Sequence, residues 1–387
     1  MKFSRGIVLT ILAFLGYLGS AQAGVLPEDR ADVLYHLYDG GGMEIDGTSV
    51  LVRKQIGKST SLVANHYTDM VSSASIDVIT TASPYSEERT QWSLGMDYLR
   101  GNTTMRVSYT NSEESDFLAK TYAFSVSQDM FGDMTTLTLS YGKGDDTVGR
   151  SDDPSFEREN DRQHYGISLT QILTRDLITT LNFETITDEG HLNNPYRSVR
   201  YQDSGTALGY SYEPELYPAT RTSTAVGLSA KYYMPYRAAL QAQYRFFTDT
   251  WDIEAHTASL SYTHPWGDFV FTGKARWHDQ TGAHFFRDIF PRAQATNFRG
   301  RDKELSPLTS TLLQIGGSYE FIKEGSDAWG FIKKGTVNAS YSFYTVDYHE
   351  FRNVSTSAAL GEEPVSYTHL TLPTKVLVCR SRWSPYH

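Results

Sequence analysis

The chain has 387 residues, a formal charge of -10 and a mean hydropathy of -0.41, which describe an acidic, hydrophilic protein. This acidity argues against nucleic acid as a partner. After the N-terminal region, no stretch reaches the roughly 18 consecutive apolar residues that a membrane-spanning helix needs. Aromatic residues nevertheless make up 13% of the chain. The combination is typical of a membrane β-barrel, whose strands are only half apolar, and a secreted β-sandwich or surface lectin is the soluble alternative.

Residues 1–23 have the pattern of a secretory signal peptide. Lys2 and Arg5 precede an apolar run, and a small-residue cleavage site ends at Ala23. The apolar run is too short to cross a membrane as a helix, so we expect an exported chain that starts at Gly24. A retained N-terminal anchor is the alternative.

The body between the two ends is more acidic than the whole chain. It holds all 45 acidic residues, whereas five of the 35 basic residues lie in the ends, so its formal charge is about -15. The single cysteine, Cys379, lies in the C-terminal tail. We therefore expect no disulfide bonds and a stability that rests on packing and backbone pairing.

Alternating apolar and polar residues predict β-strands along the whole body. In DMTTLTLSY (133–141), Leu137, Leu139 and Tyr141 fall on one face of a strand and polar residues on the other. A period of two indicates strands rather than helices. The pattern predicts fifteen strands, at about 32–38, 43–56, 59–72, 89–100, 103–112, 119–130, 133–143, 163–173, 176–188, 220–233, 237–249, 255–264, 268–278, 309–322 and 335–348.

The predicted connections alternate in length. Tight turns are expected near 57–58, 101–102, 131–132, 174–175, 234–236 and 265–267. Longer polar connections lie between them, at 73–88, 144–162, 189–219 and 279–308. Short periplasmic turns and long outer loops are the arrangement of an all-β, antiparallel β-barrel of the bacterial outer membrane.

The C-terminal tail bears on how such a barrel closes. Single-chain bacterial barrels have even strand numbers, and an open edge in lipid leaves backbone groups unsatisfied. Residues 365–387 contain Pro373 and Pro385, which a central strand does not accommodate, and VSYTHLTLPTK resembles translated sequencing-adapter read-through. We therefore expect a barrel over residues 24–364, about 16 strands in the native protein with the last one missing, and a non-native tail at 365–387.

Several segments resemble one proteobacterial outer-membrane family. They are ASPYSEERTQ (82–91), NSEESDF (111–117), SQDMFGD (127–133), LTQILT (169–174), ITDEGHLNNPYRSVRY (186–201), FTDTWDI (247–253) and RDKELS (301–306). The family is catalogued as domain of unknown function 3570, and the resemblance covers about residues 26–352. It implies an outer-membrane barrel whose final strand ends in an aromatic residue, which this chain lacks.

An acidic segment, residues 142–161, is a weak candidate for a metal site. Asp145, Asp146, Asp152 and Asp153 can bind calcium or bridge divalent ions in lipopolysaccharide. Their spacing lacks the regular pattern of a calcium loop, so a solvated acidic loop is the alternative. No cofactor is predicted.

Six arginines lie in the two longest predicted loops, among aromatic residues. They are Arg197, Arg200, Arg287, Arg292, Arg299 and Arg301. Such arginines can pair with the acidic segment as an inward plug, or recognise anionic sugars. Alternatively, the two loops pack on each other at the barrel mouth.

Histidines at the predicted outer rim raise the question of an enzyme. His278, Asp279 and His284 lie close in sequence, and His191 falls in a neighbouring loop. No hydrolase motif accompanies them, so we predict that the protein is not an enzyme and keep an outer-rim hydrolase as a minor alternative.

The alternation directs a set of charged residues to the barrel lumen. They are Arg106, Lys231, Arg245, Lys274, Arg276, Asp97 and Glu184. Mixed charge fits either a water-filled channel or a salt-bridged, plugged lumen. We expect a porin-like transporter of small solutes, or else a structural or docking barrel for a periplasmic redox or export partner. Outer-membrane lipid, lipopolysaccharide and the barrel-assembly machinery are the other expected partners, and nucleic acid is not.

Overall fold

The computed structural model describes residues 25–40, 43–73, 85–322, 335–352 and 364–371, which are almost entirely β-structure. Within these ranges, no helix is long and apolar enough to cross a membrane. The predicted signal peptide and the final residues 372–387 lie outside the described residues. The elements are β1 Arg30–Gly40, β2 Met43–Ile56, β3 Thr60–Ser73, β4 Tyr85–Arg100, β5 Thr103–Glu113, β6 Phe117–Met130, β7 Thr135–Val148, β8 Arg158–Thr174, β9 Leu177–Gly190, β10 Ser198–Gln202, β11 Tyr210–Pro214, β12 Thr220–Tyr233, β13 Ala239–Asp249, β14 Glu254–Trp266, β15 Phe269–Gln280, the 3-10 turn η1 Lys303–Leu305, β16 Leu308–Ile322, β17 Gly335–Arg352 and β18 Pro364–Thr371.

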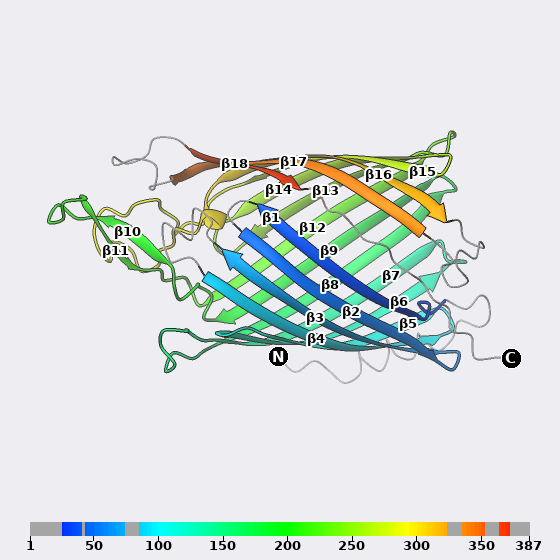
Figure 1. Ribbon diagram of the computed structural model, residues 1–387, viewed down its shortest axis with the longest axis horizontal. Coiled ribbons are helices and arrows are strands. Elements are labelled where there is room, and N and C mark those ends of the chain that lie inside the picture. The colour runs from blue at the N-terminus through cyan, green and yellow to red at the C-terminus, as the bar shows by residue number, and fades with distance from the viewer. Residues whose placement is uncertain (1–24, 41–42, 74–84, 323–334, 353–363, 372–387) are drawn as a thin grey trace.

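Sixteen of these strands form one antiparallel sheet that follows the chain order. The exception is the hairpin of β10 and β11, which forms a separate two-stranded sheet, so that β9 pairs with β12. The large sheet curls round a long axis, and the hairpin stands beyond the ends of its strands (Figure 1). The two edges, β1 and β18, approach within 8 Å between Cα atoms, and no ladder of described residues joins them.

The fifteen predicted strands are all present, as β1–β9 and β12–β17. Two neighbours are longer than predicted: β7 continues to Val148 and β8 begins at Arg158, because their ladder extends through the pairs Asp145↔Asp161 and Asp146↔Asn160. The hairpin of β10 and β11 falls inside a segment predicted to be loop. The alternation therefore located the strands, and their ends were the least accurate part.

A sixteenth strand, β18, was not predicted. Its residues pair with the second half of β17, from Ser342↔Thr371 to Asp347↔Ser366. The prediction that no strand follows β17 is wrong, because residues 364–371, which precede Pro373 in the sequence, pair with β17. The non-native origin of residues 365–387 stays a prediction.

The two faces of the large sheet differ in chemistry. On the outer face, large apolar side chains are exposed, with Leu94, Ile167 and Ile315 at 55%, 48% and 67% exposure. The alternate positions form the inner face, which carries polar and charged groups such as Asp97. Inner-face side chains from β6 to β12 line one cavity together with the loop after β15, so the inner face is the concave one.

Among the described connections, those at the turn end are all short, and the long ones lie at the loop end, as predicted. At the turn end, Gly57 and Gly101 adopt φ values of +69° and +60°, which glycine tolerates without strain. At the loop end, the longest described connections are residues 191–219 and 281–307. The loop end is therefore where this chain has most room for a functional site.

Candidate functional site

The loops 191–219 and 281–307 fold onto each other and form a unit that we call the loop cap. Main-chain bridges join Tyr201 to Phe290 and Leu216 to Arg299. In the second bridge the backbone N–H of Leu216 donates to the Arg299 carbonyl at 2.9 Å, and the reverse bond is 2.7 Å. The two loops are thus held together by backbone pairing, although about 80 residues separate them in sequence.

Two buried arginines share one carboxylate inside the loop cap. Arg200 and Arg301, each 2% exposed, lie 3.0 Å and 2.9 Å from oxygens of Asp288. Arg301 also donates to the backbone carbonyl of Arg352 at 2.7 Å, and its guanidinium lies over the ring of Phe351. These contacts tie the cap to the end of β17. Because buried charge is costly unless it is paired, Asp288 is the electrostatic centre of the cap.

The other predicted loop arginines divide into two groups. Arg299 pairs with Glu213 at 3.2 Å, and Arg197 pairs with Asp302 at 3.1 Å. Arg287 and Arg292 are exposed and form no ion pair with a described residue. Four of the six arginines therefore pair with acids of the cap itself and not with the acidic segment 142–161.

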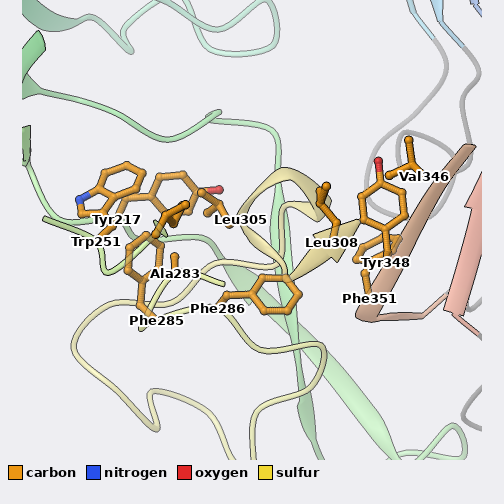
Figure 2. Close-up of a cluster of buried hydrophobic side chains, with 11 residues drawn as sticks. Tyr217, Trp251, Ala283, Phe285, Phe286, Leu305, Leu308, Val346, Tyr348 and Phe351 are labelled. Atoms are coloured by element: carbon orange, nitrogen blue, oxygen red, sulfur yellow. The ribbon is translucent and has the colours of Figure 1, made fainter. Parts of the chain in front are cut away.

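The cap has an apolar core that anchors it to the inner face of the sheet. Figure 2 shows one group around Trp251 and Phe285 and a second group around Leu308 and Tyr348, with Phe286 between them. Alternation directs Leu308 and Tyr348 from β16 and β17 to the concave side, where Phe286 meets them. The cap therefore folds inward over the sheet near β16 and β17.

Asp249, at the end of β13, organises the short loop 250–253 beneath the cap. Its side chain is fully buried and accepts bonds from the backbone N–H groups of Trp251 and Ile253, at 2.9 Å and 3.0 Å. Arg221 on β12 donates to the same carboxylate at 2.6 Å and lies over the Trp251 ring, 4.5 Å from its centroid. One carboxylate thus fixes the loop, the tryptophan and the neighbouring strand.

Glu215 is a second buried carboxylate of the cap, at 4% exposure. It accepts hydrogen bonds from the Tyr217 hydroxyl and the Arg301 backbone N–H, both at 2.7 Å. Burial raises the pKa of Glu215, against the smaller opposing effect of these bonds. The folded cap therefore stabilises the protonated carboxyl more than water does.

This shift predicts a pH effect. Because the folded-state pKa of Glu215 is raised, the stability it contributes is greatest below the ordinary carboxyl pKa and falls as pH rises through the raised value. At neutral pH, Glu215→Gln should leave the thermal midpoint unchanged or raise it, since the amide keeps a hydrogen-bond acceptor. Melting curves of both proteins at acidic and neutral pH test this, and a clearly lower midpoint of the variant at neutral pH would contradict it.

A cavity of about 860 Å³ lies between the cap and the inner face of β6–β9. Its strand wall on β6 and β7 consists of small residues, including Ala119, Ala123, Gly142 and Gly144. Its other wall is polar and includes Asn160 and Arg162 of β8, and residues 191–196 and Leu305 of the cap also line it. The space therefore exists because β6 and β7 have no long side chains at these inner positions.

Buried polar groups in this cavity have no partner. Asp146 and Asn160 face each other across the β7–β8 ladder, and each is 8% exposed. Asp146 is near the charge of Arg162 and forms no side-chain hydrogen bond with a described residue, and the Oδ1 atom of Asn160 is buried without a hydrogen bond. The Nε2 atom of His191 is also buried without a hydrogen bond. Burial and the nearby Arg158 charge lower the pKa of this imidazole.

Hydrogen bonds join neighbouring loops at the outer rim of the cavity. The Tyr196 hydroxyl donates to the Asp116 carboxylate and accepts from the backbone N–H of Ser151 at 2.7 Å. Arg150 pairs with Asp152 at 2.6 Å and lies over the Tyr196 ring. The loops 114–116, 149–157 and 191–219 are therefore joined at the rim.

The four aspartates proposed for a metal are dispersed. Asp145 and Asp146 lie on β7 rather than in a loop, on opposite faces, and Asp145 pairs with Lys143 at 2.7 Å. Asp152 is paired with Arg150, and Asp153 accepts from the Ser155 backbone N–H at 3.0 Å. Within the described ranges no three histidine, cysteine or acidic side chains gather to hold a metal ion. The prediction that Asp145 and Asp146 lie in a loop was wrong. The β7–β8 ladder continues beyond the residues whose alternation of apolar and polar side chains predicted the strand.

The predicted lumen residues all fall on the inner face. Arg106 pairs with Asp97 at 2.5 Å, Arg53 pairs with the same carboxylate, and Arg245 pairs with Glu184 at 2.5 Å. A separate set of bases, all on β12 and β15, has no ion pair with a described residue: Lys231, Lys274 and Arg276.

The rim histidines do not come together as a catalytic group. His278 bonds with Thr257 at 2.8 Å on the inner face, whereas His284 lies near the backbone carbonyl of Trp251 in the cap. Sequence reasoning missed Asp249, Asp288 and Asn160. Asp249 lies in the family-like segment FTDTWDI, and no local signal marks the other two residues.

A curled antiparallel sheet with a capped loop end is thus the class of structure that this chain adopts. The family described as "Protein of unknown function (DUF3570)" matches residues 47–324, and the chain belongs to that family. The predicted resemblance is confirmed.

Solved structures show distant likeness. The siderophore receptor PirA from Pseudomonas aeruginosa matches at 10% identity and a TM-score of 0.47, over 83% of this chain and 57% of that one. PirA from Acinetobacter baumannii matches at 12% identity and a TM-score of 0.46, over 92% of this chain and 59% of that one. The copper transporter OprC matches at 10% identity and a TM-score of 0.44, over 91% of this chain and 58% of that one. The chain spans less than two thirds of each. No curated protein matches the sequence.

Proposed function

We propose that the protein is an outer-membrane β-barrel that passes small solutes through its lumen. The observation that carries the proposal is the contrast between the two faces of the curled sheet. The outer face exposes large apolar side chains from nearly every long strand, far more than a soluble surface carries, and lipid is the environment that would cover them. In the proposal the sheet closes along the edge where β18 approaches β1.

The strand number supports a water-filled interior. The sheet has sixteen strands, and barrels of about that size leave an aqueous channel where smaller barrels are filled by side chains. Lys231, Lys274 and Arg276 carry charge on the inner face without a described partner, which is favourable only in contact with water. The loop cap covers part of the loop end and leaves the cavity beside β6–β9 as the entrance.

Planar-bilayer recording tests the proposal. Folded protein should conduct ions, and Lys274→Gln with Arg276→Gln should shift the permeability ratio of K⁺ to Cl⁻ several-fold toward K⁺, because two positive charges leave the pore wall. The double variant Lys58→Gln with Arg175→Gln removes the same charge from the turns and should shift it much less. Absence of current from heat-modifiable, folded protein would sink the proposal.

A further inference from the structure

We propose that the cavity beneath the loop cap is a binding site for a small organic cation with N–H donors, such as an ammonium or guanidinium compound. This inference rests on the proposed function, because it names the class of solute that the entrance would select. It also makes a binding claim that can be tested without any current.

The size of the cavity suits a small solute. A volume of about 860 Å³ lies within the range of small-molecule sites, roughly 300–1,000 Å³. Alanine and glycine on β6 and β7 keep one wall flat, and a Cβ atom built at Gly142 would still stand 3.7 Å from that of His164. A ligand can therefore lie along this wall without displacing side chains.

The charge of the lining favours a cation. Three bases line the cavity, and each is already paired: Lys143 with Asp145, Arg162 with Asp188 and Arg221 with Asp249. Six carboxylates line it, namely Glu114, Asp116, Asp146, Asp188, Asp302 and Glu304. The lining therefore carries an excess of negative charge.

The unpartnered polar atoms specify N–H donors. Asp146 and the Oδ1 atom of Asn160 are hydrogen-bond acceptors, nine-tenths buried and adjacent across one ladder. Burial and the Arg158 charge lower the pKa of His191, and in the tautomer with its proton on Nδ1 the buried Nε2 atom is a further acceptor. Buried acceptors without hydrogen bonds are costly in a folded protein, and the N–H groups of a bound ammonium or guanidinium would pair with the Asn160 oxygen and the Asp146 carboxylate.

Calorimetric titration of the full, detergent-solubilised protein tests the site with three probes of similar length: agmatine, hexanediol and adipate. Agmatine is cationic at both ends, hexanediol is neutral and adipate is anionic. Agmatine should bind at least about tenfold more tightly than either of the others, because only agmatine brings charged N–H donors. Equal binding of adipate, or no binding of agmatine at millimolar concentration, would overturn the inference.

Adjacent residues of β7 provide a matched pair of variants. Asp146→Asn should weaken agmatine binding by about tenfold or more, because the buried carboxylate is lost. Asp145→Asn removes the same charge one residue away, on the outer face, and keeps the Asp146 carboxylate, so it should weaken binding much less than Asp146→Asn does, although Lys143 loses its partner. Equal weakening by the two variants would refute a site at Asp146.

Asn160→Leu separates binding from folding. The substitution removes an unsatisfied polar atom, so the thermal midpoint should stay or rise while agmatine affinity falls several-fold. A lower midpoint with unchanged affinity would show a structural role and count against the site.

The bilayer recording and the calorimetric titration test the channel and the binding site independently of each other. Protein that conducts but does not bind agmatine would refute the site and keep the proposed channel. Protein that binds agmatine with the stated selectivity but passes no current would refute the channel and keep the site.

Discussion

Replacing Asp288 by asparagine is expected to release the loop cap. Arg200 and Arg301 share this carboxylate, and the substitution leaves two guanidinium groups, each 2% exposed, without a counter-charge. Breaking a buried ion pair costs about 3 kcal/mol or more, which corresponds to roughly a hundredfold change in the opening equilibrium. Trypsin should therefore cleave the loop 281–307 much faster, at the exposed Arg287 and Arg292.

The matched control lies at the tip of the other loop of the cap. Asp203 is also an aspartate that accepts local bonds, from the backbone N–H of Gly205 at 2.9 Å and the hydroxyl of Ser211 at 2.8 Å, but it is only half-buried, in the turn of the β10–β11 hairpin. Asp203→Asn should leave cleavage of the loop 281–307 within about twofold of the unmodified protein, because surface changes of this kind have small effects. Equal cleavage of the Asp288→Asn variant and the unmodified protein would show that the shared carboxylate does not hold the cap.

Removal of the Asp249 carboxylate is expected to have a comparable effect on global stability. Asp249→Ala leaves the N–H groups of Trp251 and Ile253 without their acceptor and the Arg221 guanidinium without its partner. Together these losses should lower the free energy of unfolding by about 4 kcal/mol. Asp249→Asn keeps one acceptor and should give an intermediate value. Urea unfolding followed by tryptophan fluorescence provides the measurement.

The same loop supplies a control for Asp249. Asp252 has a side chain that is 77% exposed and a φ of +67°, a conformation that asparagine also tolerates. Asp252→Asn should therefore change the unfolding free energy by less than about 0.5 kcal/mol. If Asp249→Asn were as mild as Asp252→Asn, the assigned role of the buried carboxylate would be wrong.

The strands and the inner face could be predicted because alternation is a local signal. Leu139 and Tyr141 already show in the sequence which face of β7 is apolar. In β5 and β13 the same alternation directs Arg106 and Arg245 to the face opposite the apolar side chains. Charged pairs across neighbouring inner positions then follow from strand order. Local information therefore fixed the sheet and the polarity of its two faces.

The loop cap could not be predicted, because its contacts join residues far apart in sequence. Arg200 and Asp288 are separated by 88 positions in connections without a repeating pattern. Several acids were available to the loop arginines, and only the packing around Phe290 and Val199, both fully buried, determines which one lies in reach. The cavity at Asp146 and Asn160 depends on the cap above it, so it was equally invisible in the sequence.

The carboxylate of Asp97 has a consequence for how the sheet is assembled. It is fully buried and joins Arg53 of β2 to Arg106 of β5 across β3 and β4. If any of these strands slipped by one residue, its side chains would exchange faces, and Asp97 or an arginine would point into hydrocarbon in the proposed membrane. A charge in that position costs several kcal/mol. In the proposed membrane, misaligned strands would thus be energetically disfavoured during insertion, and the correct alignment would be the most stable one.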